Sequence, residues 1–261
     1  MTPKSDSEIK EMSRLQSSIK NQVGLIRIHG RDGSNLIDEL MVAELKEVIN
    51  SFDDNPEVRA IVLSSSGTNF SAGSALKNLR GRADLNSHRI ALDVANARKI
   101  TIASLRGKVL DQGLELALAC DVRFASAKTR FGLTHVKYGC IPWDGGTQRL
   151  PRVIGPSRAL YMMLTGVTID ITQALEFGLV SEITTEIHDE ELSLAFGSIV
   201  ANHGPIAVQY LKEAVNSGSD LSIEEGMRLE LDLATLLHST NDRAEGLRAF
   251  AEKRKPEFNG D

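Results

Sequence analysis

One acidic residue, Glu115, interrupts the apolar run Leu114–Cys120 (LELALAC) near the middle of the chain. The run consists of strong helix formers and is apolar on nearly every side, so it predicts a helix buried in the core. Glu115 falls in the first turn of this helix, where free N–H groups and the helix dipole favour a carboxylate, whereas burial raises its pKa. The residue is therefore either a capping group that reaches solvent or a general acid–base in a dry pocket.

Glycine-containing turns lie on both sides of this run. Gly107–Gly113 precedes it and follows an apolar strand expected at 101–105. After it come His135, a proline-bounded turn and the pair Gly145–Gly146, which opens a further predicted helix. Glycines ahead of a helix allow a ligand to approach the backbone N–H groups closely. We therefore expect the functional site within residues 103–149.

Composition and charge exclude several classes of function. The 261 residues are 41% hydrophobic and 25% charged, as in an ordinary soluble globular protein. The net charge is −5, with no block of five like charges, which argues against a nucleic-acid partner or an anionic membrane surface. Cys120 and Cys140 form neither a metal-binding pattern nor a disulfide framework. The polar N-terminus is no signal peptide and no apolar run is long enough to span a membrane, so we expect a cytoplasmic protein without a membrane partner.

Hydrophobic periodicity predicts an α/β fold that ends in helices alone. Strands are expected at 22–29, 59–64, 101–105, 122–125 and 179–183. Helices are expected at 37–52, 85–98, 114–120, 156–164 and 172–177, followed by 192–202, 205–216, 223–237 and 242–253. This shift in pattern predicts three parts: a loose N-terminal arm at 1–16, a core with the active site at 17–195, and a helical region at 196–261.

Several segments occur together in the order of a known family. They are residues 70–76 (FSAGSAL), 107–121 with GLELALACD, 131–155 with GGTQRLPRVIG, 164–166 with 178–180, and the tail 249–256 (AFAEKRKP). With these segments the chain resembles the crotonase superfamily, the enoyl-CoA hydratase/isomerase family, from about Val23 to Phe258.

The resemblance implies a fold, an assembly and a chemistry. The fold is a crotonase-like spiral of ββα units with a C-terminal helical oligomerisation region, and the assembly is a homotrimer or homohexamer. The substrate is an acyl-CoA thioester whose carbonyl lies between two backbone N–H groups while an enolate forms. Such donors stabilise the developing charge by about 3–4 kcal/mol each. Coenzyme A is then part of the substrate, and neither a separate cofactor nor a metal is expected.

By position, the two donors of this oxyanion hole are the N–H groups of Ser74 and Gln112. Gln112 stands where the family usually has glycine, because its triple-glycine run is here Asp111-Gln112-Gly113. Any residue except proline keeps the N–H group. However, the glutamine side chain narrows the approach of a substrate, and Asp111 adds a charge.

Glu115 matches the first catalytic glutamate of the family's hydratases, and His135 stands where the second one belongs. Paired carboxylates divide acid and base roles through their different environments, and a histidine that titrates near neutrality can take one of these roles. Hydration of a 2-enoyl-CoA is therefore the function that the resemblance favours. A non-catalytic relative that binds RNA or protein is disfavoured by the acidic composition and by the retained Glu115 and His135.

Asp144, nine residues after His135, supports an alternative. The same spacing resembles the 6-oxocamphor hydrolase (β-diketone hydrolase) branch, in which an aspartate orients a histidine that activates water for C–C cleavage of a small diketone. An orienting carboxylate fixes the imidazole tautomer and stabilises its cation. It also remains open that both residues have only structural roles, with His135 packing in the core and Asp144 capping the helix that begins at Gly145.

Further contacts with the substrate are expected from the first loop, from the turn before the glycine pair and from the tail. These residues are Ala72, Gly73, Leu76, Trp143, Phe250 and Lys253. The resemblance implies that Phe250 and Lys253 reach a nucleotide bound to a neighbouring subunit. On the sequence alone, Lys253 could equally be a cation at the negative end of a helix, and Trp143 could simply pack in the core.

Overall fold

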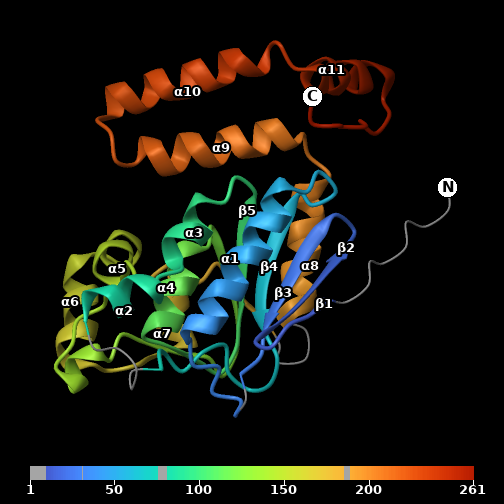
Figure 1. Ribbon diagram of the computed structural model, residues 1–261. Coiled ribbons are helices and arrows are strands. Elements are labelled where there is room, and N and C mark those ends of the chain that lie inside the picture. Colours follow the sequence, from blue (N-terminus) through green and yellow to red (C-terminus); the bar gives the residue numbers. More distant parts are fainter. Residues whose placement is uncertain (1–9, 31, 76–80, 185–188) are drawn as a thin grey trace.

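A seven-stranded sheet with the order β1-β2-β3-β4-β5-β7-β10 forms the centre of the molecule (Figure 1). The computed structural model describes residues 10–30, 32–75, 81–184 and 189–261. The first three strands pair antiparallel and the following ones parallel. Their bounds are β1 (Lys10–Glu11), β2 (Leu15–Lys20), β3 (Val23–Ile28), β4 (Ala60–Ser65), β5 (Ile100–Leu105), β7 (Val122–Ser126) and β10 (Glu182–Thr184).

Helices cover both faces of this sheet, which explains why β4 is buried along its whole length. Ile61 and Leu63 of β4 join the main core, together with apolar residues of α1 (Glu39–Asp54). Val62 points the other way and packs with apolar residues of α8 (Asp189–Ala201). The alternation of side chains along one strand therefore connects two helical layers through the sheet.

A second sheet of three strands brings the site residues together. It consists of β6 (Lys108–Leu110), β8 (Arg130–Gly132) and β9 (Ile169–Asp170), in that order. β6 leads directly into α4 (Gln112–Ala119), and β8 leads into the short 3-10 helix η2 (His135–Tyr138). The N–H of Asp111 donates to the carbonyl of Gly132 at 2.8 Å. The helix with Glu115 and the turn with His135 therefore begin side by side.

The remaining helices include neighbours of α4 and the helices at the C-terminal end of the chain. They are α2 (Arg82–Ser87), α3 (Ala91–Asn96), α5 (Gly146–Ile154), α6 (Pro156–Thr165), α7 (Ile171–Glu176), α9 (Pro205–Gly218), α10 (Ile223–Leu237) and α11 (Asn241–Glu252). α4 contacts α3 on one side and α5 on another. The predicted helix 85–98 is divided into α2 and α3.

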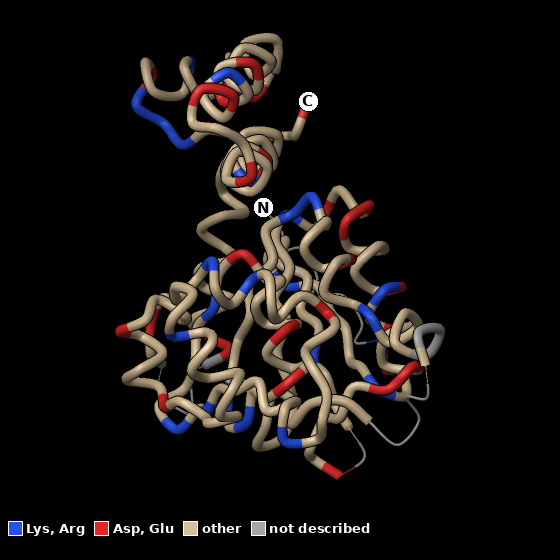
Figure 2. The backbone as a smooth tube through the Cα atoms, turned by 90° about the vertical axis from the view of Figure 1, so that its left-hand side faces the viewer, with Lys and Arg blue, Asp and Glu red and all other residues tan. Residues whose placement is uncertain are grey.

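The hairpin of α9 and α10 and the following α11 stand away from the sheet (Figures 1 and 2). Lys212 of α9 connects the hairpin to the core, because its ammonium lies 2.8 Å from Oδ2 of Asp121 and 3.0 Å from the carbonyl of Lys99. α8, in contrast, packs on the sheet through residues such as Phe196. The predicted domain boundary after residue 195 falls inside α8, and the chain leaves the core only at 202–204.

The predicted loose arm at 1–16 also differs from the structure. Its first nine residues lie outside the described part, but β1 and the first residues of β2 belong to the sheet. β2 pairs with β3 along its whole length, and Leu15 is fully buried in the main core. The predicted strand 179–183 is shifted, since Leu179 and Val180 pack in the core and β10 begins at Glu182.

Lys and Arg residues are interspersed with Asp and Glu along the backbone (Figure 2). Among the described residues, no helix is both long and apolar enough to cross a bilayer. Over the same residues, no group of three or more His, Cys, Asp or Glu side chains is arranged to hold a metal ion.

Candidate active site

Glu115 lies fully buried in the first turn of α4. Its Oε1 accepts hydrogen bonds from the backbone N–H groups of Asp144 and Gly146, each at 2.8 Å. A Cβ at Gly146 would lie 3.0 Å from this oxygen, so glycine permits the close approach. Oε2 has no hydrogen-bond partner in the described part of the chain and lies 3.8 Å from Nε2 of His135. One carboxylate oxygen is thus fixed and the other is available for chemistry.

Burial raises the pKa of Glu115 to about 7, against the opposing effect of its two backbone hydrogen bonds. The charges of Asp144 and Asp111 raise this pKa further. A carboxyl group with such a pKa can give or take a proton near neutrality, as a general acid–base must.

His135 is the first residue of η2, and its ring is buried. The Trp143 ring packs against it in a T-shaped arrangement, with the ring centroids 4.9 Å apart. Burial lowers the pKa of His135, and the charge of Asp111 acts in the opposite direction. The imidazole is therefore expected to be neutral at neutral pH, so that it can accept a proton.

Asp111 faces His135 from the other side, although the sequence prediction did not include it among the catalytic residues. Its Oδ1 lies 3.4 Å from Nδ1 of His135. The same oxygen accepts hydrogen bonds from the backbone N–H and the hydroxyl of Thr134, at 2.5 and 3.0 Å. A sequence signal for this residue exists, because Asp111 occupies a position where the family usually has glycine.

The side chain of Asp144 is directed away from His135. Its Oδ2 accepts hydrogen bonds from the N–H groups of Ile90 and Ala91 at 2.9 and 3.2 Å, at the start of α3. Within 4 Å of the ring nitrogens of His135, the described residues place the carboxylates of Asp111 and Glu115 and not that of Asp144. The structure thus corrects the predicted His135–Asp144 pair: Asp144 caps α3 and supplies a backbone N–H to Glu115.

The two predicted oxyanion-hole residues lie next to each other. The hydroxyl of Ser74 donates to Oε1 of Gln112 at 2.7 Å. Gln112 is the first residue of α4, where a backbone N–H has no acceptor within its helix. For the N–H groups of both Ser74 and Gln112, the described residues provide no acceptor. Two free donors are therefore available on adjacent segments.

Both the oxygen and the nitrogen of the Gln112 side-chain amide form hydrogen bonds. This fixes the side chain that was predicted to narrow the approach of the substrate. Its amide nitrogen donates to the carbonyl of His88 and to Oδ2 of Asp144, the latter at 3.2 Å. The whole residue is buried. The side chain is thus part of the wall of the site and has a fixed position.

The other predicted contact residues are divided between two regions. Ala72 and Gly73 precede Ser74 in the first loop, whereas Leu76 lies outside the described residues. Trp143 is half-buried beside His135, and its indole N–H has no partner among the described residues. The remaining two, Phe250 and Lys253, are exposed on and after α11, away from α4 within the same chain (Figure 1).

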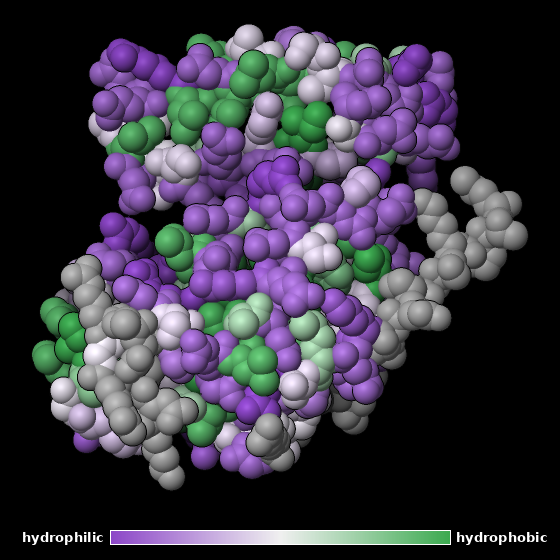
Figure 3. All heavy atoms as spheres, viewed as in Figure 1, coloured by the Kyte–Doolittle hydropathy of each residue, from purple (hydrophilic) through white to green (hydrophobic). Residues whose placement is uncertain are grey.

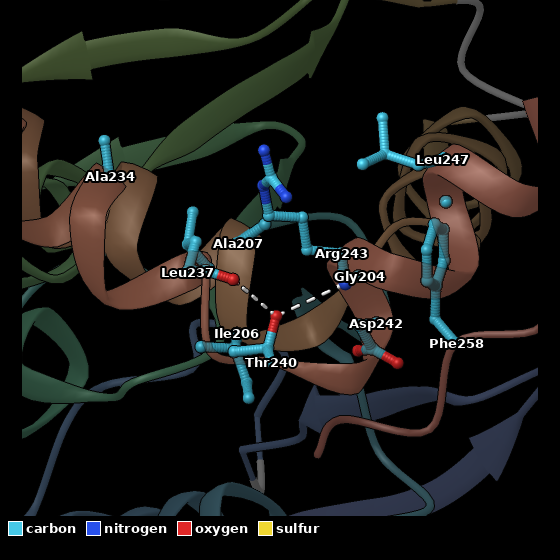
Figure 4. A pocket seen from close by; sticks show the side chains of 11 residues that line it. Gly204, Ile206, Ala207, Ala234, Leu237, Thr240, Asp242, Arg243, Leu247 and Phe258 are labelled. Carbon is cyan, nitrogen blue, oxygen red and sulfur yellow. Dashed lines mark hydrogen bonds between the residues drawn. The ribbon is translucent and has the colours of Figure 1, made fainter.

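A concave region lies among the C-terminal helices. It is an apolar cavity of about 390 Å³ between α9, α10 and α11, where Ile206, Leu237 and Phe258 form part of the lining (Figure 4). All its lining residues come from 204–258, so this cavity is separate from the site around Glu115.

Known proteins resemble this chain over nearly its whole length. Residues 18–261 match the family model described as enoyl-CoA hydratase/isomerase. A probable enoyl-CoA hydratase of Rhizobium meliloti (strain 1021) is 36% identical, over 92% of this chain and 95% of that protein. The 2,3-dehydroadipyl-CoA hydratase of Escherichia coli (strain K12) is 34% identical, over 95% of this chain and all of that protein.

Solved structures show the same likeness. The crystal structure of an enoyl-CoA hydratase from Bacillus anthracis superposes with a TM-score of 0.89 at 31% identity, covering 98% of this chain and 100% of that one. The enoyl-CoA hydratase of Mycobacterium tuberculosis H37Rv gives a TM-score of 0.90 at 26% identity, covering 96% of this chain and 100% of the other. The sequence-based expectation of the crotonase fold is confirmed, and the chain belongs to the enoyl-CoA hydratase/isomerase family.

Proposed function

We propose that this protein adds water across the double bond of a 2-enoyl-CoA thioester. The observation that carries the proposal is the buried pair of Oε2 of Glu115 and Nε2 of His135, 3.8 Å apart. Neither atom has a hydrogen-bond partner among the described residues, so both are available to a water molecule and a substrate. The similarity to proteins named as enoyl-CoA hydratases supports the same reaction and disfavours the diketone alternative.

The oxyanion hole supplies the first part of the mechanism. The thioester oxygen accepts hydrogen bonds from the N–H groups of Ser74 and Gln112. As water attacks Cβ, the electron pair of the double bond moves toward this oxygen and an enolate forms. Fixed N–H donors stabilise this charge by about 3–4 kcal/mol each, because they need no reorganisation during the reaction.

Glu115 and His135 divide the proton transfers. Neutral His135 takes a proton from the attacking water through Nε2 while the oxygen bonds to Cβ. Glu115, whose pKa is raised to about 7, donates its proton to Cα as the enolate returns to the thioester. The proton on His135 then passes to Glu115, which restores the site. The sum of these steps adds one OH and one H to the substrate.

The assembly expected from the family also belongs to this proposal. Large apolar side chains are exposed on the hairpin of α9 and α10 (Figure 3), including Leu211, Val215, Ile223, Met227, Leu231 and Leu236. Exposed apolar surface of this kind is typical of protein interfaces. We propose a homotrimer or homohexamer in which Phe250 and Lys253 contact a CoA ester bound to the neighbouring subunit, with no cofactor besides the CoA of the substrate. Sedimentation velocity tests the assembly, and a monomer at micromolar concentration contradicts it.

Hydration of crotonyl-CoA tests the reaction, followed as loss of the absorbance of the conjugated thioester. We expect turnover by the wild type and a loss of about 10²- to 10⁴-fold in Glu115→Gln, because an amide cannot transfer the proton. The amide oxygen can still accept the two backbone hydrogen bonds of Oε1, so the fold is retained. Glu47→Gln, at an exposed carboxylate of α1, is the matched control. A wild type that hydrates no 2-enoyl-CoA but cleaves a cyclic β-diketone without CoA contradicts the proposal.

A further inference from the structure

We infer that Asp111 is a positioning residue, which holds Nδ1–H of His135 toward its carboxylate and thereby directs the Nε2 lone pair toward Glu115. This inference rests on the proposed function, in which His135 accepts the proton of water. It assigns the orienting role to a carboxylate that lies 24 residues before His135 in the chain.

The first argument is the arrangement of charged groups around the ring. Asp111 lies at Nδ1, at 3.4 Å, and Glu115 at Nε2, at 3.8 Å. The Trp143 ring packs against the imidazole in a T-shaped arrangement, and the charge of Asp144 raises the pKa of Glu115. The contacts of Asp111 and Glu115 with the ring nitrogens are longer than ordinary hydrogen bonds, as is common for catalytic contacts before the substrate binds. Asp111 is thus the group placed to fix the tautomer.

The second argument is that the side chain of Asp111 does not cap its own helix. An aspartate at the N-cap normally accepts a hydrogen bond from one of the first N–H groups of the helix. Here only the backbone carbonyl of Asp111 accepts, from Leu114 and Glu115 at 2.9 and 3.0 Å. The carboxylate turns instead to Thr134, whose N–H and hydroxyl hold it beside His135. One residue thereby connects the start of the Glu115 helix with the histidine.

The third argument is the backbone conformation at Asp111. Its φ of 49° and ψ of −122° lie in a region that glycine adopts freely and other residues rarely adopt. Such a conformation strains the backbone of a residue other than glycine and tends to occur at functional sites. A glycine would avoid this strain, so the presence of a carboxylate here points to a role for its charge.

Two variants test the charge of Asp111 separately from its backbone conformation. Asp111→Asn keeps the acceptor for Thr134 but removes the negative charge, and asparagine tolerates a positive φ. Asp111→Gly removes the carboxylate and the backbone strain at this position, so we expect the variant to fold. NMR of ¹⁵N-labelled histidine reports the tautomer and the pKa of His135. In both variants we expect the pKa of His135 to fall and the proton to leave Nδ1 in part of the molecules.

Kinetics with the 2-enoyl-CoA substrate give the second readout. We expect kcat to fall by about 10- to 100-fold in both variants, a part of the contribution typical of a general base, with little change in KM. The pH dependence of kcat/KM should shift with the pKa of His135. Asp170→Asn, at the N-cap of α7, is the matched control, because asparagine also caps a helix.

The outcomes distinguish this inference from the proposed function. Wild-type kinetics together with an unchanged His135 tautomer and pKa in Asp111→Asn overturn the inference, while the hydratase proposal stands. If the wild type hydrates no 2-enoyl-CoA, the proposed function fails. The NMR comparison still decides whether Asp111 orients His135, since it needs no substrate.

Discussion

Single side chains in the site show how burial and hydrogen bonding oppose each other. Glu115 keeps two hydrogen bonds to its Oε1, yet its burial dominates and raises the pKa to about 7. The group therefore binds a proton more tightly in the folded protein than in the unfolded chain, where its pKa is near 4.5. Proton binding and folding are consequently linked between these two pH values.

This linkage predicts a pH dependence of stability. The raised pKa stabilises the folded state below pH 4.5, and this contribution is lost as the pH rises to about 7. Relative to Glu115→Gln, we expect the wild type to lose about 3 kcal/mol of unfolding free energy across this window. Urea denaturation of both proteins at several pH values measures the difference. Parallel stability curves would show that Glu115 titrates normally.

At the scale of elements, α1 depends on a well-formed N-cap. Asp38 accepts a hydrogen bond from the N–H of Met41 at 2.9 Å and pairs with Arg14 at 2.6 Å. We expect Asp38→Ala to lower the unfolding free energy by about 1–2 kcal/mol, since it removes both interactions. Asp38→Asn, which keeps the cap, should cost less. Chemical denaturation measures both variants, and equal losses would assign the whole effect to the ion pair with Arg14.

At the scale of the whole molecule, the C-terminal helices depend on few contacts with the core. Lys212 is nearly buried and pairs with the nearly buried Asp121 at 2.8 Å. Removal of one partner from such a pair leaves the other charge uncompensated. We expect Lys212→Met to lower the unfolding free energy by about 3 kcal/mol. It should also speed proteolytic cleavage near residues 202–204, where the chain leaves the core.

A matched control for this prediction lies on the neighbouring helix. Arg228 and Glu224 form an exposed ion pair on α10, and such pairs contribute little to stability. Arg228→Met should therefore leave both the unfolding free energy and the cleavage rate unchanged. Equal effects of the two substitutions would indicate that the Lys212 pair does not hold the hairpin.

Much of the architecture follows from local pattern. The strands β3, β4, β5 and β7 were predicted nearly at their observed bounds. Alternating apolar and polar residues indicated β3, and apolar runs indicated β4 and β5. Short elements such as β6 and β8 were missed, since three residues carry too little periodicity. The position of α8 was also missed, because a helical pattern does not reveal which surface the helix covers.

The sequence alone determined that Glu115 lies in a buried helix and that the chain resembles this family, and it predicted His135 as a second polar group of the site. Only the tertiary structure decided which carboxylate faces His135. Asp144 has the spacing expected of a partner, yet it bonds to the start of α3. Asp111 is more distant in the chain, yet the pairing of β6 with β8 places it at Nδ1. Spacing along the chain limits where a residue can lie, whereas the direction of its side chain depends on packing and on competing hydrogen-bond donors.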